Sequence, residues 1–319
     1  MKVLVTGGAG FIGSHVCDGL LERGDEVICI DDFNDYYDPR IKEENIRSAL
    51  QNSKFKLYRA DIRDYLLVKK IFAKEIPDKV VHLAARAGVR ASIKNPLLYQ
   101  EVNVKGTLNL LELAKEFRVK NFVFASSSSV YGVNKKMPFA ENDQINNIVS
   151  PYAATKLEGE MACRNYHEMH GLNISCLRFF TVYGPRGRPD MAPYKFTKLI
   201  DEGKEIPMYG NGATSRDYTY ISDIVKGIIS ALDKNFGFEI FNLGNSKAIE
   251  LRHFISVIEN LLGKNAVIKR MPLQEGDVPA TYADISKARK MLGYNPRTSI
   301  EDGMGKFVDW FKEAIWMSQ

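Results

Sequence analysis

The chain has 319 residues, of which 45% are hydrophobic and 26% charged, with a formal net charge of +5. This length can bury a substantial core, and the composition is that of a globular protein rather than a fibrous or disordered one. The sequence has no basic run typical of a nucleic-acid groove, no apolar run of membrane-spanning length and no secretory leader at its start. We therefore expect a cytoplasmic protein that binds neither nucleic acid nor membrane.

Short, β-rich apolar runs alternate with helical patterns through the first half of the chain. Strands are expected at residues 2–6, 26–30, 56–60, 80–83, 121–125 and 174–178. Helices are expected between them, at residues 11–23, 66–74, 102–117 and 152–170. Strands that are buried on both faces and alternate with helices predict an α/β fold with a doubly wound parallel sheet, the Rossmann arrangement.

After Gly184 the rhythm changes, because prolines and glycines punctuate a looser region. A helix is expected near residues 194–202, and a strand at 239–243 that returns to the main sheet. One more helix is predicted by an apolar stripe with helical spacing, which consists of Leu251, Phe254, Ile255, Ile258, Leu261 and Leu262. The second half therefore predicts a smaller lobe that is interleaved with the first.

The cysteines predict buried free thiols. None has Cys-x-x-Cys spacing, and all four lie in apolar segments, at Cys17, Cys29, Cys163 and Cys176. His167 and His170 are three residues apart, but no third ligand accompanies them, so we expect no metal site there.

A glycine-rich turn follows the first expected strand and opens a helix, in the order Gly7-Gly8-Ala9-Gly10-Phe11-Ile12-Gly13. Glycines let the backbone approach a pyrophosphate, and the helix offers free N–H groups and the positive end of its dipole. The second strand ends in Asp31 and Asp32, where an acid accepts hydrogen bonds from the adenosine ribose and repels a 2′-phosphate. The pattern predicts a site for NAD rather than NADP. The alternative is that either aspartate merely caps the next segment.

Three side chains form a candidate proton-transfer group. Tyr152 and Lys156 are four residues apart, so they share one face of a helix. An ammonium near a phenol favours the phenolate and lowers the pKa of the phenol. Ser127, at the end of the fifth expected strand, could share the proton. Together with a dinucleotide loop, the group indicates a base that deprotonates a sugar hydroxyl while a nicotinamide accepts hydride. Without the loop, the pair could equally be an ordinary surface pair.

These motifs, in this order, resemble the extended short-chain dehydrogenase/reductase family, specifically its nucleotide-sugar epimerases, dehydratases and decarboxylases. The resemblance covers nearly the whole chain and rests on residues 6–13, 61–64, 82–85, 103–107, 126–132, 152–156 and 215–218. It implies tightly held NAD, with Tyr152 as the base, Ser127 as the catalytic serine and Lys156 at the nicotinamide ribose. The implied cofactor contacts are Gly7, Gly10, Phe11, Ile12, Gly13, Asp31, Asp32, Asn34, Asp61, Ile62, Leu83, Ala84, Ala85, Asn103, Tyr152, Lys156 and Phe179.

Within the family, the two residues before the Val-Tyr-Gly at 130–132 separate the chemistries. The 4,6-dehydratases carry Asp-Glu there, and the decarboxylases carry a Glu immediately before the valine. Ser128 and Ser129 occupy these positions here, so the extra acid is missing. The resemblance therefore implies 4-epimerization, in which a 4-keto intermediate rotates and takes hydride back on its other face.

The segment 178–193 resembles the UDP-glucuronate 4-epimerase group, although a bulky aromatic is commoner at Arg186. A sugar carboxylate needs donors, which Thr181 with Arg186 or Arg188 could supply. The other implied substrate contacts are Ser127 and Ser128, Arg90 and Arg216 at the diphosphate, and Gln274 and Asp277 near the uridine.

The leading interpretation is the conversion of UDP-glucuronate to UDP-galacturonate. One alternative is a UDP-glucose or UDP-N-acetylglucosamine 4-epimerase. Another is a non-catalytic, NAD-bound sensor or assembly subunit, although such a protein need not keep Ser127, Tyr152 and Lys156 together.

We expect residues 1–180, with return segments near 217–244, to form the NAD-binding Rossmann domain. Residues 181–216 and 245–319 are expected to form the nucleotide-sugar-binding lobe. In this family the helices at 102–117 and 152–170 often form a dimer interface, so the resemblance also implies a homodimer.

Overall fold

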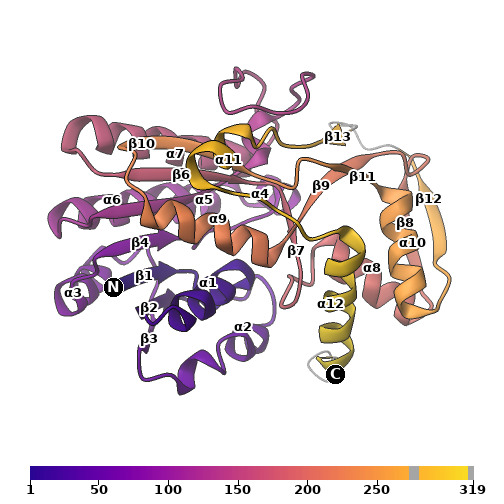
Figure 1. Ribbon diagram of the computed structural model, residues 1–319, viewed down its shortest axis with the longest axis horizontal. Coiled ribbons are helices and arrows are strands. Elements are labelled where there is room, and N and C mark those ends of the chain that lie inside the picture. The colour runs from indigo at the N-terminus through magenta and orange to yellow at the C-terminus, as the bar shows by residue number, and fades with distance from the viewer. Residues whose placement is uncertain (273–279, 315–319) are drawn as a thin grey trace.

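The structure, a computed structural model, describes residues 1–272 and 280–314. A parallel sheet of seven strands lies at its centre, in the order β10-β6-β5-β4-β1-β2-β3 (Figure 1). The strands are β1 (Lys2–Thr6), β2 (Glu26–Asp31), β3 (Phe55–Arg59), β4 (Lys79–His82), β5 (Asn121–Ser127), β6 (Ile174–Phe179) and β10 (Phe238–Leu243). Each lies within two residues of an expected strand, and the doubly wound α/β fold is confirmed.

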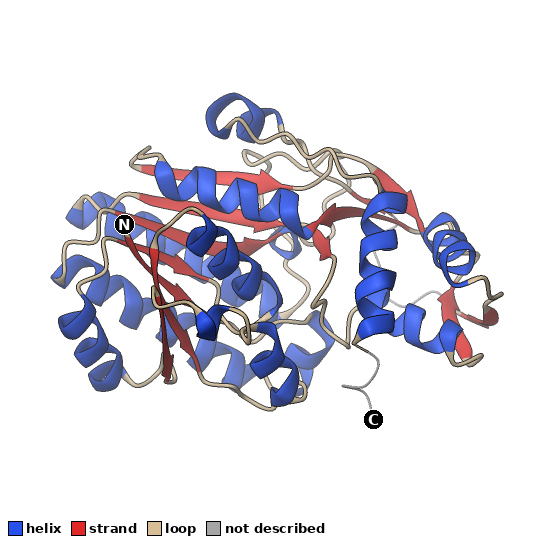
Figure 2. Cartoon of the chain, turned by 60° about the horizontal axis from the view of Figure 1, so that its bottom comes forward, coloured by secondary structure: helices blue, strands red, loops and turns tan. Residues whose placement is uncertain are grey.

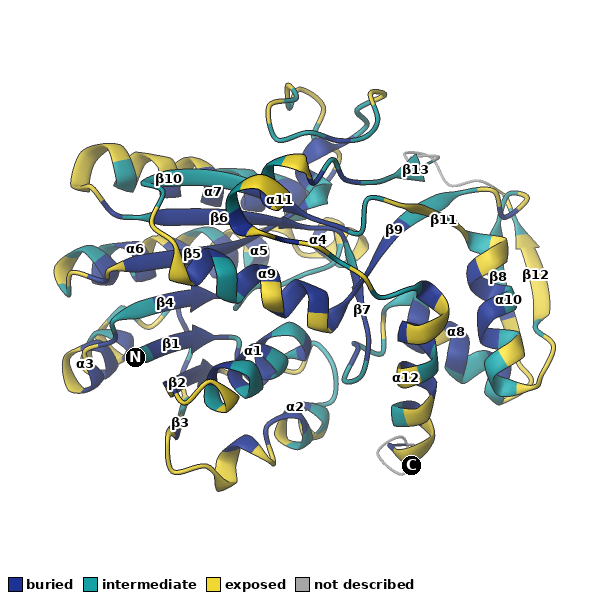
Figure 3. Ribbon diagram, viewed as in Figure 1, coloured by how far each residue is buried: buried dark blue, intermediate teal, exposed yellow. Residues whose placement is uncertain are grey.

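Helices cover both faces of this sheet (Figure 2). Side chains alternate along β1, so that Val3 and Val5 enter one hydrophobic core and Leu4 enters the other. The first core is covered by α1 (Phe11–Glu22) and α9 (Ile221–Asp233), and the second by α3 (Tyr65–Glu75), α6 (Gly106–Glu116) and α7 (Pro151–His170). The central strands are buried on both faces (Figure 3), which explains their continuous apolar sequences.

The helix expected at 102–117 has two parts. Its first turns are the π-helical segment η2 (Gln100–Lys105), and α6 follows without a break. The Thr107 hydroxyl donates to the carbonyl of Asn103 at 2.5 Å within these turns. Gly106 lies so close to Ile62 that a Cβ at the glycine would come within 2.5 Å of the Ile62 Cδ1. This approach fastens the helix to the loop that follows β3.

A smaller lobe is built on two further sheets, at the right of Figure 1. One sheet contains β7 (Thr181–Tyr183), β9 (Ser215–Tyr220), β11 (Ala248–Glu250) and β13 (Ala280–Thr281); the other pairs β8 (Glu205–Tyr209) with β12 (Val267–Met271). The expected helices near 194–202 and at 251–262 are present as α8 (Ala192–Asp201) and α10 (Leu251–Leu262), beside α12 (Ile300–Glu313). The return to the main sheet begins at α9, because β9 belongs to the smaller lobe.

The remaining helices are short and were not predicted. They are α2 (Pro39–Asn45), α4 (Val89–Lys94), α5 (Pro96–Tyr99), α11 (Ser286–Leu292) and the single turns η1 (Ala49–Gln51) and η3 (Ser128–Tyr131).

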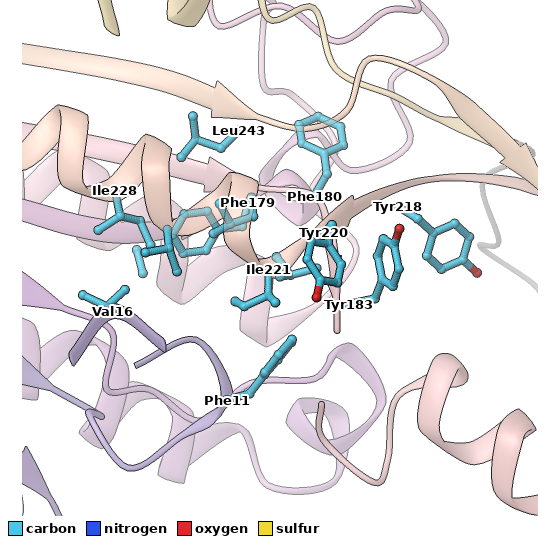
Figure 4. Packing of buried hydrophobic residues seen from close by; sticks show 14 of the residues in the cluster. Phe11, Val16, Phe179, Phe180, Tyr183, Tyr218, Tyr220, Ile221, Ile228 and Leu243 are labelled. Carbon is cyan, nitrogen blue, oxygen red and sulfur yellow. The ribbon is translucent and has the colours of Figure 1, made fainter. Parts of the chain in front are cut away.

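One hydrophobic core runs from the main sheet into the smaller lobe. In Figure 4, Phe179 and Phe180 at the end of β6 lead to Tyr183, Tyr218 and Tyr220 of β7 and β9. Aromatic rings pack edge to face along this path, as between Tyr183 and Tyr220 at 5.6 Å. The continuous core fixes the position of the smaller lobe against the main sheet.

The four cysteines are buried and free, as expected. The Nδ1 of His167 lies 2.9 Å from the carbonyl of Leu172, and no group of three or more potential metal ligands occurs among residues 1–272 and 280–314. Within the same residues, no helix combines the length and the apolar character needed to cross a membrane.

Candidate active site

A cavity of about 400 Å³ lies where β1, β4 and β5 end. The carboxyl ends of parallel strands are where such sheets bind ligands. Most residues proposed for the cofactor line this cavity: Gly7, Gly10, Phe11, Ile12, Gly13, Asp31, Asp32, Asn34, Asp61, Ile62, Leu83, Ala84, Ala85, Tyr152, Lys156 and Phe179. Phe180, Thr181, Arg188 and Met191 add a wall from the region after β6, so one space joins the glycine loop to the smaller lobe.

The glycine loop has the geometry that its sequence predicts. Gly7 has a φ of +70°, and a Cβ on Gly13 would lie 2.0 Å from the carbonyl oxygen of Gly7. Larger residues are therefore excluded by backbone conformation at one position and by space at the other. No side chain caps the start of α1 at Gly10, so the first N–H groups of the helix remain available to a phosphate.

Asp31 shapes this loop as well as lining the cavity. Its carboxylate accepts hydrogen bonds from the N–H groups of Ala9 at 3.1 Å and Phe33 at 2.9 Å. Burial raises the pKa of Asp31, and the charge of Lys42 partly offsets this rise. The Nζ of Lys42 lies 3.8 Å from the Asp31 carboxylate, and the buried side chain lines the cavity. Sequence reasoning missed Lys42, because only the folded α2 brings it to the end of β2.

Asn103 was expected to contact the cofactor, but it does not belong to the described lining of the cavity. Its side chain accepts a hydrogen bond from the N–H of Arg86 at 2.8 Å and donates to the Arg86 carbonyl at 3.0 Å. It also donates to the Thr155 hydroxyl at 3.0 Å. Asn103 therefore fastens the turn after β4 to α7.

Tyr152, Lys156 and Ser127 all reach the cavity. The Lys156 ammonium donates to the carbonyl of Ala125 at 2.7 Å, and burial lowers the pKa of Lys156 to about 8. Burial raises the pKa of Tyr152, while a hydrogen bond with Ser127 and the charge of Arg188 lower it. The expected lowering by Lys156 is not seen, because that ammonium is directed to the end of β5. The charge that lowers the pKa of Tyr152 comes from Arg188 instead.

A buried ion pair connects the elements that carry these three residues. Glu160 lies one helical turn beyond Lys156, and its carboxylate accepts from the Arg178 Nε at 2.8 Å and Nη2 at 2.7 Å. The Ser126 hydroxyl donates to the same carboxylate at 2.5 Å. The side chains of Glu160 and Arg178 are only 3% and 2% exposed. The pair therefore ties α7 to β5 and β6, which carry Ser127 and Phe179.

Thr181, Ser127, Ser128 and Arg188 line the cavity together with Ser129. The Arg188 guanidinium donates to Asp190 through Nε at 2.9 Å and Nη2 at 2.6 Å. It also lies 5.3 Å from the centre of the Tyr36 ring. Tyr36 comes from the loop after β2 and was missed in the sequence, where no periodic pattern marks that loop.

Three other arginines expected at the substrate lie outside the described lining of the cavity. Arg186 pairs with Asp18 of α1 at 2.6 Å and does not belong to the described lining, whereas Arg188, the alternative carboxylate donor, does. Arg90 lies 5.6 Å from the Tyr209 ring centre, and Arg216 donates to the carbonyl of Ser215 at 2.9 Å. Neither belongs to the described lining of the cavity. Gln274 and Asp277 lie outside the described residues.

The sequence model of one protein family, described as GDP-mannose 4,6 dehydratase, matches residues 4–307. The chain belongs to this family. A UDP-glucuronate 4-epimerase from Thermodesulfobacterium geofontis is 46% identical over 313 residues, which are 98% of this chain and 96% of the relative.

Solved structures of family members agree with this assignment. UDP-glucuronic acid 4-epimerase from Bacillus cereus, in complex with UDP-glucuronic acid and NAD, has a TM-score of 0.92 and 39% identity, covering 98% of this chain and 99% of that one. UDP-glucose 4-epimerase from Thermotoga maritima, with UDP-glucose, has a TM-score of 0.91 and 33% identity, covering 99% and 100%.

This family member is an NAD-dependent nucleotide-sugar 4-epimerase, an isomerase of the extended short-chain dehydrogenase/reductase type. The cavity fits NAD: the glycine loop leaves room for a pyrophosphate, the uncapped start of α1 faces it, and Asp31 and Asp32 lie at the end of β2. Ser128 and Ser129, the two residues before Val130, also line the cavity.

Proposed function

We propose that this enzyme interconverts UDP-glucuronate and UDP-galacturonate by inverting C4 of the sugar. The observation that carries the proposal is the position of Arg188, which lines the cavity and whose charge acts on the Tyr152 phenol. C4 and the C6 carboxylate of a glucuronate are separated by one ring atom. A cation beside the catalytic base is therefore well placed for that carboxylate.

Donors around Arg188 support the same choice. Thr181 and Ser128 line this end of the cavity with it. The pairing with Asp190 engages the Nε and Nη2 of Arg188. A bidentate or charge-assisted hydrogen bond to a carboxylate is about twice as strong as a neutral one. The names of the Thermodesulfobacterium and Bacillus relatives point in the same direction.

In the proposed mechanism, Tyr152 takes the proton of the C4 hydroxyl and Ser127 shares it. Bound NAD supplies an acceptor for the C4 hydride and later a donor of it. The 4-keto sugar then makes a half-turn, and Tyr152 returns the proton as hydride reaches the opposite face of C4. Thr181 and Arg188 hold the carboxylate during this turn. Lys156 would hold the nicotinamide ribose.

We assign the remaining roles by the same reasoning. Arg90 and Arg216 are proposed at the diphosphate, and Gln274 and Asp277 at the uridine. Residues 1–180, with return segments near 217–244, would hold NAD, and residues 181–216 and 245–319 would hold the nucleotide sugar. We further propose a cytoplasmic homodimer that joins through α6 and α7. Leu108 and Met161 on these helices are 39% and 64% exposed, and sedimentation of the purified protein tests the dimer.

Turnover of three substrates tests the proposed reaction. UDP-glucuronate, UDP-glucose and UDP-N-acetylglucosamine are compared with no added NAD, and UDP-glucuronate should have the highest kcat/KM. Leaving one buried donor unpaired typically costs about 1–3 kcal/mol, so each lost carboxylate contact should reduce the preference about tenfold to a hundredfold. Thr181→Ala and Arg188→Ala should show this reduction, and Arg40→Ala, an exposed arginine on α2, should not.

Two results would contradict the proposal. One is a parent enzyme that prefers UDP-glucose, which would favour the neutral-sugar alternative. The other is substantial release of a UDP-pentose, because Ser128 and Ser129 replace the acid that decarboxylation uses.

A further inference from the structure

The loop between β7 and α8, residues 184–191, carries Arg188 and is called the sugar loop below. One side of the loop faces the cavity, where Arg188 and Met191 line the wall. The opposite side rests on α1, the helix that opens at the glycine loop. The sugar loop therefore lies between the substrate and the helix aimed at the cofactor pyrophosphate.

Two polar contacts join the sugar loop to α1. The Arg186 Nη1 lies 2.6 Å from the Asp18 carboxylate, and the His15 Nε2 lies 2.9 Å from the carbonyl of Pro185. His15 and Asp18 are three residues apart, so they share one face of α1. A carbonyl only accepts hydrogen bonds, so the His15 Nε2 carries the proton. We call these four residues, His15, Asp18, Pro185 and Arg186, the clasp.

The clasp reaches the start of the cofactor helix. The His15 ring packs edge to face on Phe11 at 6.0 Å, and Phe11 is the first residue of α1 and part of the cavity wall. Burial lowers the pKa of His15 to about 4, so this contact does not change protonation near neutral pH. A shift of the sugar loop is therefore opposed directly by the helix that faces the pyrophosphate.

The backbone of the sugar loop is unusual at the clasp. Arg186 has a φ of +62°, in the left-handed region that non-glycine residues rarely adopt. The N–H of Gly187 donates to the carbonyl of Gly184 at 3.1 Å, which closes a tight turn around it. A residue held in a sparsely populated conformation persists where its surroundings determine it, and Asp18 and His15 supply those surroundings.

The contacts that Arg188 itself makes do not hold the sugar loop against α1. Asp190 belongs to the same loop and moves with Arg188. Tyr36 reaches the pair from outside, with a hydrogen bond of 3.4 Å to Asp190. These contacts orient the guanidinium within the loop, whereas the clasp fixes the loop against α1.

We propose that Arg186 and Asp18, with His15 and Pro185, are positioning residues that set where Arg188 meets the substrate carboxylate. This inference rests on the proposed preference for UDP-glucuronate. Arg186 does not touch the sugar; it acts through Arg188, two residues further on. Loosening the clasp should therefore reduce kcat/KM for UDP-glucuronate more than for UDP-glucose, and so reduce the ratio of the two.

The test is a double-mutant cycle on this ratio with the NAD-bound enzyme. Asp18→Ala and Arg186→Ala should each reduce the ratio about three- to tenfold, and the double variant should be no worse than either one. Arg186→Lys, which keeps the charge, should retain most of the parent ratio. In an Arg188→Ala background, Asp18→Ala should have no further effect, because the residue through which the clasp acts is gone.

Asp233→Ala provides a matched control. Asp233 pairs with Arg23, which directly follows α1. The substitution therefore removes a half-exposed ion pair near the same helix but at a distance from the sugar loop. It should leave the ratio unchanged, even if the melting temperature falls as much as in Asp18→Ala.

The outcomes separate the two proposals. If the parent prefers UDP-glucuronate and the clasp variants keep its ratio, or reduce it equally with and without Arg188, the clasp is overturned and the proposed function stands. If the parent shows no preference for UDP-glucuronate, that measurement alone overturns both.

Discussion

Two ion pairs hold the two ends of the active site, and they differ in burial. Beneath Tyr152, Glu160 and Arg178 are 3% and 2% exposed and make two hydrogen bonds to each other. At the sugar loop, Asp18 and Arg186 are 27% and 22% exposed and share one. The first pair joins a helix to the central sheet, and the second joins a loop to a helix.

The difference in burial predicts different effects of mutation at the two ion pairs. A buried pair that loses one partner leaves an uncompensated charge, whereas a half-exposed pair is screened by water and contributes little to stability. Substitution of Glu160 or Arg178 should therefore reduce the stability of the whole protein. Changes at the sugar loop should alter which substrate is used and leave the protein folded. A loop on a rigid scaffold is also where related enzymes differ most easily.

The largest effect is expected from removing the catalytic hydroxyl. Tyr152→Phe should lower kcat by about a hundredfold to ten-thousandfold, the range that a positioned acid–base group contributes, and leave UDP-sugar binding nearly intact. Steady-state kinetics with calorimetric binding measures both. Tyr166→Phe, further along α7, is the matched control, because its hydroxyl contacts Glu112 and lies outside the cavity lining as described. A near-normal kcat in Tyr152→Phe would contradict the assigned base.

Much of this end of the site could be predicted from the sequence. The central strands are buried on both faces, so their continuous apolar runs are recognisable in the sequence, and Gly7, Gly13 and Tyr152 follow from local spacing. The environment of Tyr152 could not be read in the same way. Its pKa depends on burial and on Arg188, which is distant in sequence.

The sugar loop was harder to predict. Arg186 and Arg188 are two residues apart in similar local sequence, and the left-handed φ at Arg186 decides which of them faces the cavity. The hydrogen-bond partner of Arg186, Asp18, lies 168 residues earlier in the chain. Lys42 and Tyr36 were missed for the same reason, since each reaches the cavity from a segment without a periodic pattern.

The next largest effect sharpens the contrast between the two ion pairs. Arg178→Met should lower the free energy of unfolding by about 3–5 kcal/mol, because Glu160 is left buried without its partner. Asp18→Ala should lower it by about 1 kcal/mol or less. Urea unfolding of the two variants beside the parent provides the comparison.

Replacing both buried partners, in Glu160→Leu with Arg178→Met, should cost less than Arg178→Met alone, because no charge is then left buried. Equal losses in Arg178→Met and Asp18→Ala would show that burial does not distinguish the two pairs.

Retention of NAD tests the end of the cavity away from the sugar. Asp31→Ala removes the carboxylate that accepts from Ala9 and Phe33 and that faces the proposed ribose position. The variant should lose NAD on desalting more readily than the parent, as measured by absorbance and by mass spectrometry of the released nucleotide. Asp201→Ala, at the end of α8, removes an exposed ion pair and should retain NAD. NADP bound to the purified parent would contradict the interpretation that Asp31 and Asp32 select NAD over NADP.

The last effect develops only at acid pH and concerns a buried histidine at the end of β4. The Thr107 hydroxyl donates to the Asn103 carbonyl, so its oxygen accepts from the His82 Nε2 at 2.9 Å. The Nδ1 of His82 then accepts from the Thr6 hydroxyl at 2.7 Å. His82 is therefore neutral, and burial lowers its pKa to about 3. In the unfolded chain its pKa is near 6.5.

Because the folded protein binds this proton less readily than the unfolded chain, the stability is fully present above pH 6.5 and falls as the pH drops from 6.5 toward 3. His82 alone should contribute a slope of about 1.4 kcal/mol per pH unit in this window. Urea unfolding of the parent and of His82→Gln at pH 7, 6 and 5 measures the difference in slope. His82→Gln should be less stable at pH 7, because the hydrogen bonds to Thr6 and Thr107 are disturbed, yet lose less stability on acidification. Parallel curves for the two proteins would mean that His82 is already protonated in the fold, which the direction of its hydrogen bonds opposes.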